Sequence, residues 1–406
     1  MSYKSSPKLP VKVLLLLFGF LLNAQSDFQI SSPELQGVSS SKLEILNATM
    51  HSFVDNNDLS AIQTAIVKNG KLIHFDSYGN SDISENDALE SNDIFRIASM
   101  TKPIVSVALM MLYEEGKFKL DDPVYKYIPE FKNLTVQKRK KIKPVKNHVK
   151  IIDLLRHSAG LNFKGPDDYR KVIDLTLEEY TKETIKSPLK FEPGTTWWYS
   201  YATDICGYLI EVLSQEKLDV FLKNRIFDPL EMNDTFFELP KNKLDRLTTL
   251  YVVDENKELV SFDNKANTPF KDKVILLNGS GGLLSTTEDY LKFSLMLLNN
   301  GFHNESKLIK KETLDLMKLD HSLGLKYKKF AFGKKKGFGL GFEVVKEDGT
   351  KFGSKGTFGW GGMFGTFFRI DPKENMVIIY MTQSFETYKL KLADKFRSLV
   401  YESIVE

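Results

Sequence analysis

A strand-like run turns into a long apolar helix within the stretch Phe95-Arg-Ile-Ala-Ser-Met-Thr-Lys-Pro103. Apolar residues recur at helical spacing through Thr101–Glu115, and Gly116 then ends the predicted helix. A proline is tolerated here, because the first amides of a helix have no intrahelical acceptor. On this first turn Ser99 and Lys102 are three residues apart and share one face. The stretch therefore places a hydroxyl beside an ammonium group where a helix begins.

Ser-x-x-Lys is a catalytic pattern that is weak when it stands alone. It occurs five times in this chain, beginning at Ser5, Ser39, Ser99, Ser187 and Ser214. Only the copy at Ser99 follows a strand-like run, Ile94–Ala98, and opens a long apolar helix. The alternative interpretation is a serine helix cap with a solvated lysine. The helix N-terminus favours a nucleophile instead, since its backbone N–H groups can bind an oxyanion.

A nucleophilic serine needs a proton acceptor, and histidine is the commonest one. The six histidines form no His-Glu-x-x-His pair, and the sequence has no Gly-x-Ser-x-Gly turn. His157, within Leu154-Leu-Arg-His-Ser-Ala-Gly-Leu161, is expected to be a hydrogen-bonded structural residue. No cluster of metal ligands is visible in the sequence, so we expect neither a metal nor a cofactor. The proton acceptor should therefore be a lysine, with a tyrosine as the second candidate.

Strand-like segments lie toward both ends of the chain. After an amphipathic helix at Lys42–Val54, two strand-like runs flank Asn69-Gly70, which is typical of a hairpin. Alternating β-branched and aromatic residues return over Gly337–Ser384, and a last amphipathic helix covers Tyr388–Ile404. The region between is predicted to be mostly helical, and a further helix follows at Ser285–Asn299.

This order predicts an α/β (α+β) fold, in which an antiparallel sheet is built from both chain ends and flanked by helices. The predicted domains are a discontinuous α/β domain, residues 25–117 and 262–406, and an inserted, mostly helical domain, residues 118–261.

Residues 1–24 combine lysines, a run of about ten apolar residues and a small residue at a plausible cleavage point, a pattern typical of a secretory signal peptide. We therefore expect an exported protein, periplasmic or secreted, without stable membrane insertion after signal cleavage.

The expected mature chain is close to electrically neutral. Residues 1–24 contain three of the 56 basic residues and no acidic residue, so 53 basic and 53 acidic residues remain. This balance removes the main electrostatic support for binding nucleic acid.

Cys206 is the only cysteine, which excludes an internal disulfide. Two basic runs, Lys138–Lys143 and Lys326–Lys336, are interpreted as solvated loops, with weak contact to an anionic envelope polymer as the alternative.

Three motifs in a fixed order resemble those of one superfamily. The stretch around Ser99 resembles a nucleophile segment, Tyr199-Ser-Tyr201 resembles a second motif, and Trp360-Gly-Gly362 resembles a third motif on a strand. Over roughly residues 40–400 the chain is similar to serine β-lactamases and penicillin-binding proteins, particularly to class C enzymes and their esterase relatives. The resemblance implies a β-lactamase-like fold and a reaction through an acyl-enzyme.

The resemblance also implies a role for each motif residue. Ser99 would be the nucleophile, and Lys102 and Tyr199 would handle its proton; which of the two accepts it first stays open. A neighbouring cation would favour the phenolate of Tyr199. The oxyanion hole would consist of the backbone N–H groups of Ser99 and Met363, and such donors are worth about 3–4 kcal/mol each where tested.

Two departures from the superfamily pattern indicate the substrate. Tyr201 stands where an asparagine is usual, and Trp360 and Gly361 replace the Lys-Thr of Lys-Thr-Gly. A substrate carboxylate thereby loses a charge-assisted partner, whereas an apolar acyl group gains aromatic contacts. The predicted substrate-binding residues are Tyr201, Trp360, Gly361, Gly362 and Phe364.

The sequence therefore predicts an exported serine hydrolase that acts on carboxylic esters or related small acyl substrates. One alternative is a β-lactamase or a D-amino-acid peptidase or carboxypeptidase that acts on peptidoglycan-derived substrates. An alternative of another class is a non-catalytic sensor that resembles penicillin-binding proteins, against which the intact Ser99, Lys102 and Tyr199 argue.

Overall fold

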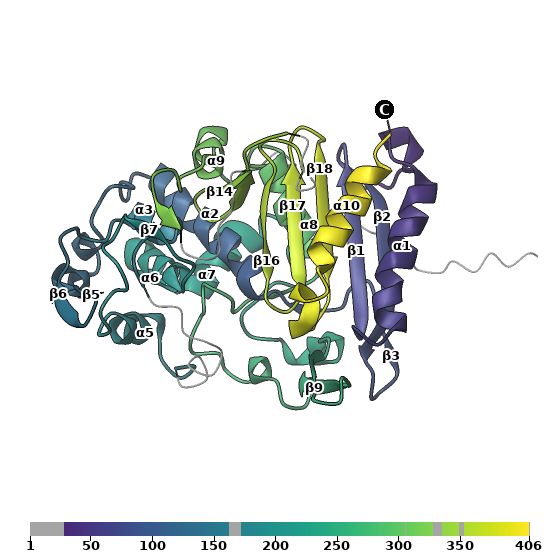
Figure 1. Ribbon diagram of the computed structural model, residues 1–406, viewed down its shortest axis with the longest axis horizontal. Helices are drawn as coiled ribbons and strands as arrows, with labels where there is room; N and C mark the ends of the chain where they lie inside the picture. Colours follow the sequence, from purple (N-terminus) through teal and green to yellow (C-terminus); the bar gives the residue numbers. More distant parts are fainter. Residues whose placement is uncertain (1–27, 162–171, 305, 328–334, 349–352, 406) are drawn as a thin grey trace, which may run out of the picture.

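The computed structural model describes the chain in five segments, residues 28–161, 172–304, 306–327, 335–348 and 353–405. Figure 1 shows a central sheet with helices on both faces and further helices at one end. The predicted signal peptide, residues 1–24, lies outside the described residues, and so does most of the second basic run.

Strands from both ends of the chain form one antiparallel sheet, as the sequence predicts. Its strands, in spatial order, are β14 (Lys336–Phe338), β15 (Glu343–Val345), β16 (Phe358–Gly362), β17 (Thr366–Asp371), β18 (Met376–Met381), β1 (Ala61–Lys68), β2 (Lys71–Asp82) and β3 (Asp87–Ala88). The early and late parts of the chain join where β1 pairs with β18. The predicted Asn-Gly turn connects β1 and β2, with φ values of 52° at Asn69 and 73° at Gly70. Asn and Gly adopt this left-handed conformation more readily than other residues, which explains their place in the hairpin.

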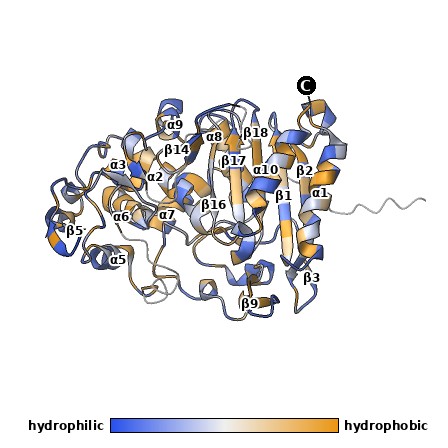
Figure 2. Cartoon of the chain, in the orientation of Figure 1, coloured by the Kyte–Doolittle hydropathy of each residue, from blue (hydrophilic) through white to orange (hydrophobic). Residues whose placement is uncertain are grey.

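Helices cover both faces of this sheet. On one face lie α1 (Ser40–Asp55) and α10 (Leu392–Ser403), packed on Phe367 and Tyr380. On the other lie α2 (Thr101–Glu114) and α8 (Thr287–Leu298), where Tyr290 contacts Phe368 with ring centroids 4.9 Å apart. Neighbouring residues of β17 thus point to opposite faces, as the period of a strand requires. Because both faces are covered, β17 and β18 are buried along their whole length and largely hydrophobic (Figure 2).

The middle of the chain packs against α2 on the side away from the sheet. Its helices are α3 (Ile151–Leu155), α5 (Leu177–Thr184), α6 (Ala202–Ser214) and α7 (Leu218–Leu222). It also contains two hairpins, β5–β6 (Thr135–Lys138, Lys141–Pro144) and β8–β9 (Leu250–Val253, Leu259–Asp263). One cluster of buried side chains runs from the sheet through α2 into α6, so the proposed domain boundaries stay a prediction.

The remaining elements are short. The helix α9 (Lys311–Lys318) precedes β13 (Lys326–Tyr327), which pairs with β7 (Thr196–Trp197), and β11 (Phe302–His303) pairs with β12 (Ser306–Lys307). No helix among the described residues combines the length and the apolar character that crossing a membrane requires.

A buried arginine holds the strand that leads to Ser99. This strand, β4 (Phe95–Arg96), pairs with β10 (Leu284–Ser285). The Arg96 guanidinium is almost inaccessible to solvent. It donates to the Thr248 carbonyl at 2.6 Å and to both carboxylate oxygens of Asp263, at 3.1 and 2.5 Å. Such a bidentate pair fixes orientation as well as distance, so β4 presents the following turn in one position.

Candidate active site

Ser99 lies on a tight turn between β4 and α2. The short helical turn Ala98–Met100 contains it, and Ala98 has a φ of 44°, which is unusual for a residue with a side chain. Such strain persists only where the surrounding structure enforces it, and it is typical of functional sites. Strand β16 packs closely here: a Cβ atom at Gly362 would lie 2.4 Å from the Ile97 carbonyl oxygen. The glycine therefore allows the third-motif strand to approach the nucleophile turn.

Lys102 places a buried ammonium group beside Ser99. Its side chain is 2 % exposed, and its Nζ donates to the Ser280 carbonyl at 2.6 Å and to Ser99 Oγ at 3.2 Å. The same Nζ lies 4.6 Å from the centroid of the Tyr199 ring. A cation over an aromatic face is attracted to the ring electrons, more strongly when it is desolvated. The three residues of the first two motifs thus form one group, as the sequence predicts; their catalytic roles stay predictions.

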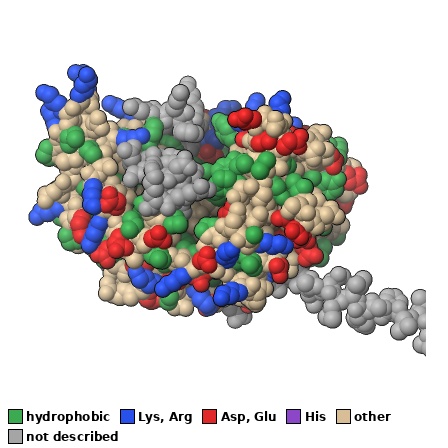
Figure 3. Space-filling view, turned by 90° about the horizontal axis from the view of Figure 1, so that it is seen from below, with side chains coloured by type: hydrophobic (Ala, Val, Ile, Leu, Met, Phe, Trp, Pro, Cys, Tyr) green, Lys and Arg blue, Asp and Glu red, His purple; other side chains and the backbone are tan. Residues whose placement is uncertain are grey.

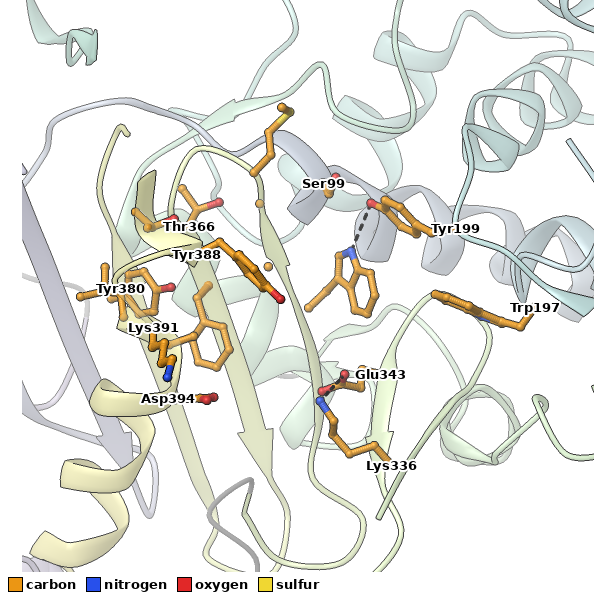
Figure 4. Close-up of a pocket in the computed structure, with 18 residues that line it drawn as sticks. Ser99, Trp197, Tyr199, Lys336, Glu343, Thr366, Tyr380, Tyr388, Lys391 and Asp394 are labelled. Carbon is orange, nitrogen blue, oxygen red and sulfur yellow. Dashed lines mark hydrogen bonds and ion pairs between the residues drawn. The ribbon is translucent and has the colours of Figure 1, made fainter. Parts of the chain in front are cut away.

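The third motif joins this group through Trp360. Its indole Nε1–H donates to the Tyr199 hydroxyl at 3.4 Å, and the two ring centroids are 5.5 Å apart. Figure 4 shows Ser99 and Tyr199 at the same side of the cavity. A tryptophan therefore contacts the proposed proton acceptor at the position where the superfamily pattern has a lysine.

A cavity of about 750 Å³ opens beside these residues. Near the nucleophile it is lined by Ser99, Trp197, Tyr199, Trp360, Gly361, Gly362 and Met363. Two predicted substrate-binding residues are not part of the lining. Tyr201 precedes the first turn of α6, and Phe364 packs against Phe385 with ring centroids 5.0 Å apart.

The cavity extends to residues that sequence reasoning missed. Beyond β16 it reaches Tyr388 and Lys391 in the segment before α10, Asp394 in the first turn of α10, and Lys336 and Glu343 on β14 and β15 (Figure 4). Lys336 and Glu343 form an ion pair of 2.9 Å. These residues belong to no recognisable motif and meet only through the packing of α10 and the sheet edge.

Asp204 is a further residue that the sequence did not indicate. It is completely buried in the first turn of α6, and its Oδ1 accepts the Ser280 backbone N–H at 2.8 Å. Its Oδ2 has no hydrogen-bond partner among the described residues. Burial raises the pKa of this carboxyl to about 6, while hydrogen bonding from Ser280 and the charge of Lys102 act against the rise. Asp204 is thus the carboxyl whose charge opposes that of the buried Lys102.

The buried side chain of His157 lies against the ring of Tyr199. The two ring centroids are 4.9 Å apart, the side chain is 1 % exposed, and its φ is 57°. Its Nδ1 has no hydrogen-bond partner within the described residues, although the sequence suggested a hydrogen-bonded histidine. Burial, and then the charge of Lys102, lower the pKa of His157 well below its ordinary value. The ring is therefore neutral next to the phenol.

The fold and this group of residues define a serine hydrolase with a β-lactamase fold. The chain belongs to the beta-lactamase family, whose sequence model matches residues 46–401.

Two relatives and one solved structure resemble the chain over most of its length. Esterase EstB of Burkholderia gladioli is 24% identical over 390 residues, which cover 88% of this chain and 94% of the esterase. A putative D-alanyl-D-alanine carboxypeptidase of Salmonella enteritidis is 26% identical over 394 residues, covering 87% of this chain and 85% of that protein. The structure of EstCE1, a hydrolase with promiscuous acyltransferase activity, superposes with a TM-score of 0.75 at 23% identity and covers 89% and 99% of the two chains. The structural likeness establishes the fold.

Asp204→Asn should lower kcat/KM by at least about tenfold, because the buried ammonium of Lys102 then loses the opposing charge of a buried carboxylate. The amide keeps an oxygen that can accept from Ser280, so only the charge is lost. Asp289→Asn is the matched control, since burial also raises the pKa of this α8 carboxyl to about 6. Steady-state kinetics and thermal melting of both variants check the prediction. Equal losses of activity in the two variants would contradict it.

The neutral, buried His157 should make the protein less stable in acid. In the unfolded chain this ring takes up a proton near pH 6.5, whereas in the folded chain its lowered pKa keeps it neutral. Stability therefore falls as the pH drops below about 6.5, by up to about 1.4 kcal/mol per pH unit. His157→Gln should reduce this slope between about pH 6.5 and 5, measured by denaturant unfolding. The exposed His148→Gln should leave it unchanged; an unaltered slope in His157→Gln would show that the ring does not contribute.

Proposed function

We propose that the protein is an exported esterase that hydrolyses carboxylic esters through an acyl-enzyme on Ser99. The observation that carries the proposal is the contact of Trp360 with Tyr199, beside the Ser99–Lys102 pair. The site combines a nucleophile and its proton-handling groups with an indole at the position where the superfamily pattern has an ammonium. The relationship to Esterase EstB supports the same substrate class. Export rests on the signal-like pattern of residues 1–24.

In the proposed reaction Ser99 Oγ loses its proton either to Tyr199 in its phenolate form or to Lys102 in its neutral amine form, and attacks the ester carbonyl carbon. The backbone N–H groups of Ser99 and Met363 stabilise the oxyanion of the tetrahedral intermediate. The carbon–oxygen bond to the alcohol breaks, and the alcohol leaves with the proton, which produces the acyl-enzyme. Water then attacks the acyl carbon and gives up a proton to the same group, the bond between the acyl carbon and Ser99 Oγ breaks, and Oγ takes that proton as the acid is released.

The lining of the cavity supports an uncharged acyl group near Ser99. Trp197, Tyr199 and Trp360 form an aromatic wall there, and none of the lining residues on β16 carries a charge. A carboxylate placed beside Trp360 would leave water and meet an uncharged indole where the superfamily pattern has an ammonium, and a buried charge without a partner costs several kcal/mol. Moving an apolar acyl chain from water into contact with the aromatic rings is favourable instead, because it buries apolar surface and no charge.

A second candidate function is cleavage of D-amino-acid peptides or β-lactams. The similarity to the putative Salmonella carboxypeptidase favours it, and the same nucleophile would serve. A hydrolysis screen with p-nitrophenyl butyrate, nitrocefin and D-alanyl-D-alanine peptides separates the candidates. The esterase proposal expects the highest kcat/KM on the ester.

Ser99→Ala should abolish hydrolysis, lowering kcat/KM by at least about three decades, because a nucleophile and its base act as a unit. A fluorophosphonate probe should label Ser99 in the wild-type protein, as located by peptide mass spectrometry. Ser214→Ala is a suitable control, since Ser214 also begins a Ser-x-x-Lys sequence but lies at the end of α6. Labelling at Ser158 or Ser280, or activity in Ser99→Ala, would refute the mechanism.

Trp360→Lys should weaken ester hydrolysis and recover part of the reactivity toward nitrocefin, because it places an ammonium where the β-lactam carboxylate would lie. The ratio of kcat/KM for nitrocefin to that for p-nitrophenyl butyrate should rise at least about tenfold, or about 1.4 kcal/mol in relative transition-state stabilisation. Trp360→Phe removes the hydrogen bond to Tyr199 without adding a charge, so it should not raise this ratio. If the wild-type protein already prefers nitrocefin to the ester, the esterase assignment is wrong.

A further inference from the structure

The β5–β6 hairpin concentrates positive charge far from the cavity. Within six residues it carries Lys138, Arg139, Lys140, Lys141 and Lys143, all exposed. None of the five forms an ion pair with another described residue, whereas many other lysines of the described chain do. The whole chain has a formal net charge of only +3, so the rest of the molecule is slightly acidic. The hairpin is thus a local cationic site on a chain that is otherwise nearly balanced.

The pairing of the two strands brings like charges together. Lys138 lies directly opposite Lys141, and Val136 lies opposite Lys143. Like charges directly opposite one another destabilise a strand pair. The base of the hairpin is nevertheless held firmly, since Val136 is buried and the backbone of Leu189 bonds to Thr135 and Gln137 at 2.7 and 2.8 Å. A fixed base thus supports a charged end whose repulsion an anionic ligand would relieve.

These five side chains also enclose a space. A hollow of about 600 Å³ is lined by Lys138, Arg139, Lys140, Lys141 and Lys143; we call it the cationic hollow. Figure 3 shows lysine and arginine side chains projecting at the end of the molecule where the hairpin lies. Like charges that line one concave surface add their potentials and attract an anion with several charges more strongly than one with a single charge.

We propose that the cationic hollow binds a linear polymer with repeated phosphate groups. A hollow suits a chain of anionic groups that can enter it, whereas a flat bilayer would touch only its rim. Ile142, the exposed large apolar residue of the hairpin, alternates with Lys141 and Lys143 and so points away from their face. This arrangement disfavours insertion into a membrane.

The hairpin also lacks aromatic side chains on which bases could stack. Residues 135–144 include no aromatic residue, and proteins that bind single-stranded nucleic acids usually stack bases on aromatic rings. Contacts of lysine and arginine side chains with phosphate oxygens depend on charge and carry no sequence information. The observations therefore favour a phosphate polymer without bases, bound by a surface that is separate from the Ser99 cavity.

The test measures binding of the full chain to end-labelled inorganic polyphosphate by fluorescence anisotropy. Because binding releases counterions, the affinity should fall at least about tenfold between about 50 and 200 mM salt. A variant in which Lys138, Arg139, Lys140, Lys141 and Lys143 are all changed to Gln should lose at least about tenfold in affinity at the lower salt concentration. Thermal melting, which does not depend on the proposed esterase activity, verifies that the variant is folded.

A matched control removes the same number of charges elsewhere. It changes Lys186, Lys217, Lys223, Lys311 and Lys373 to Gln, which are exposed, dispersed and already paired with acidic residues. This control should keep the polyphosphate affinity within about threefold of the wild type, since the five lysines are not grouped. Equal affinities for the hairpin variant and the wild type would overturn the proposal, and so would an equal loss in the control. Tighter binding to a single-stranded oligonucleotide or to phosphatidylglycerol vesicles than to polyphosphate would also overturn it.

Discussion

The buried ammonium of Lys102 constrains the whole site. A charge taken out of water is stable only with several close partners. Here the Ser280 carbonyl, Ser99 Oγ, the Tyr199 ring and the opposing charge of Asp204 fulfil this requirement. These partners come from the turn before α2, the loop before β10 and the region around the start of α6. The need to solvate one charge therefore fixes the relative positions of segments that are far apart in sequence.

Local pattern was sufficient for much of the fold. The Asn69-Gly70 hairpin, the helix after Ser99 and the sheet built from both chain ends follow from periodicity, turn chemistry and the order of elements. The proximity of Ser99, Lys102 and Tyr199 followed from the order of motifs. Asp204 and His157 could not be found in this way, because an acid in a helix and a histidine in a loop acquire significance only through what packs against them.

Proximity in sequence to a motif does not decide which residues line the cavity. Phe364 follows the third motif closely, yet it turns toward Phe385, and Tyr201 lies two residues from Tyr199 but outside the lining. Tyr388 and Lys391 do line the cavity, and both belong to the C-terminal segment of the chain. A cavity wall is a property of tertiary packing, because it depends on which element covers the sheet edge. The folded structure alone brings the segment at the start of α10 to the same cavity as Ser99.

The pairing of β1 with β18 has a consequence for the synthesis of the chain. Gln63 faces Met381 across the sheet, so the contact closes a loop of more than 300 residues. Contacts of such high sequence separation form slowly, because much chain entropy is lost before they contribute stability. Strand β1 of the N-terminal hairpin must wait for its neighbour until more than 300 further residues have been synthesised. A nascent chain therefore holds Ser99 long before it holds the sheet that supports the nucleophile turn.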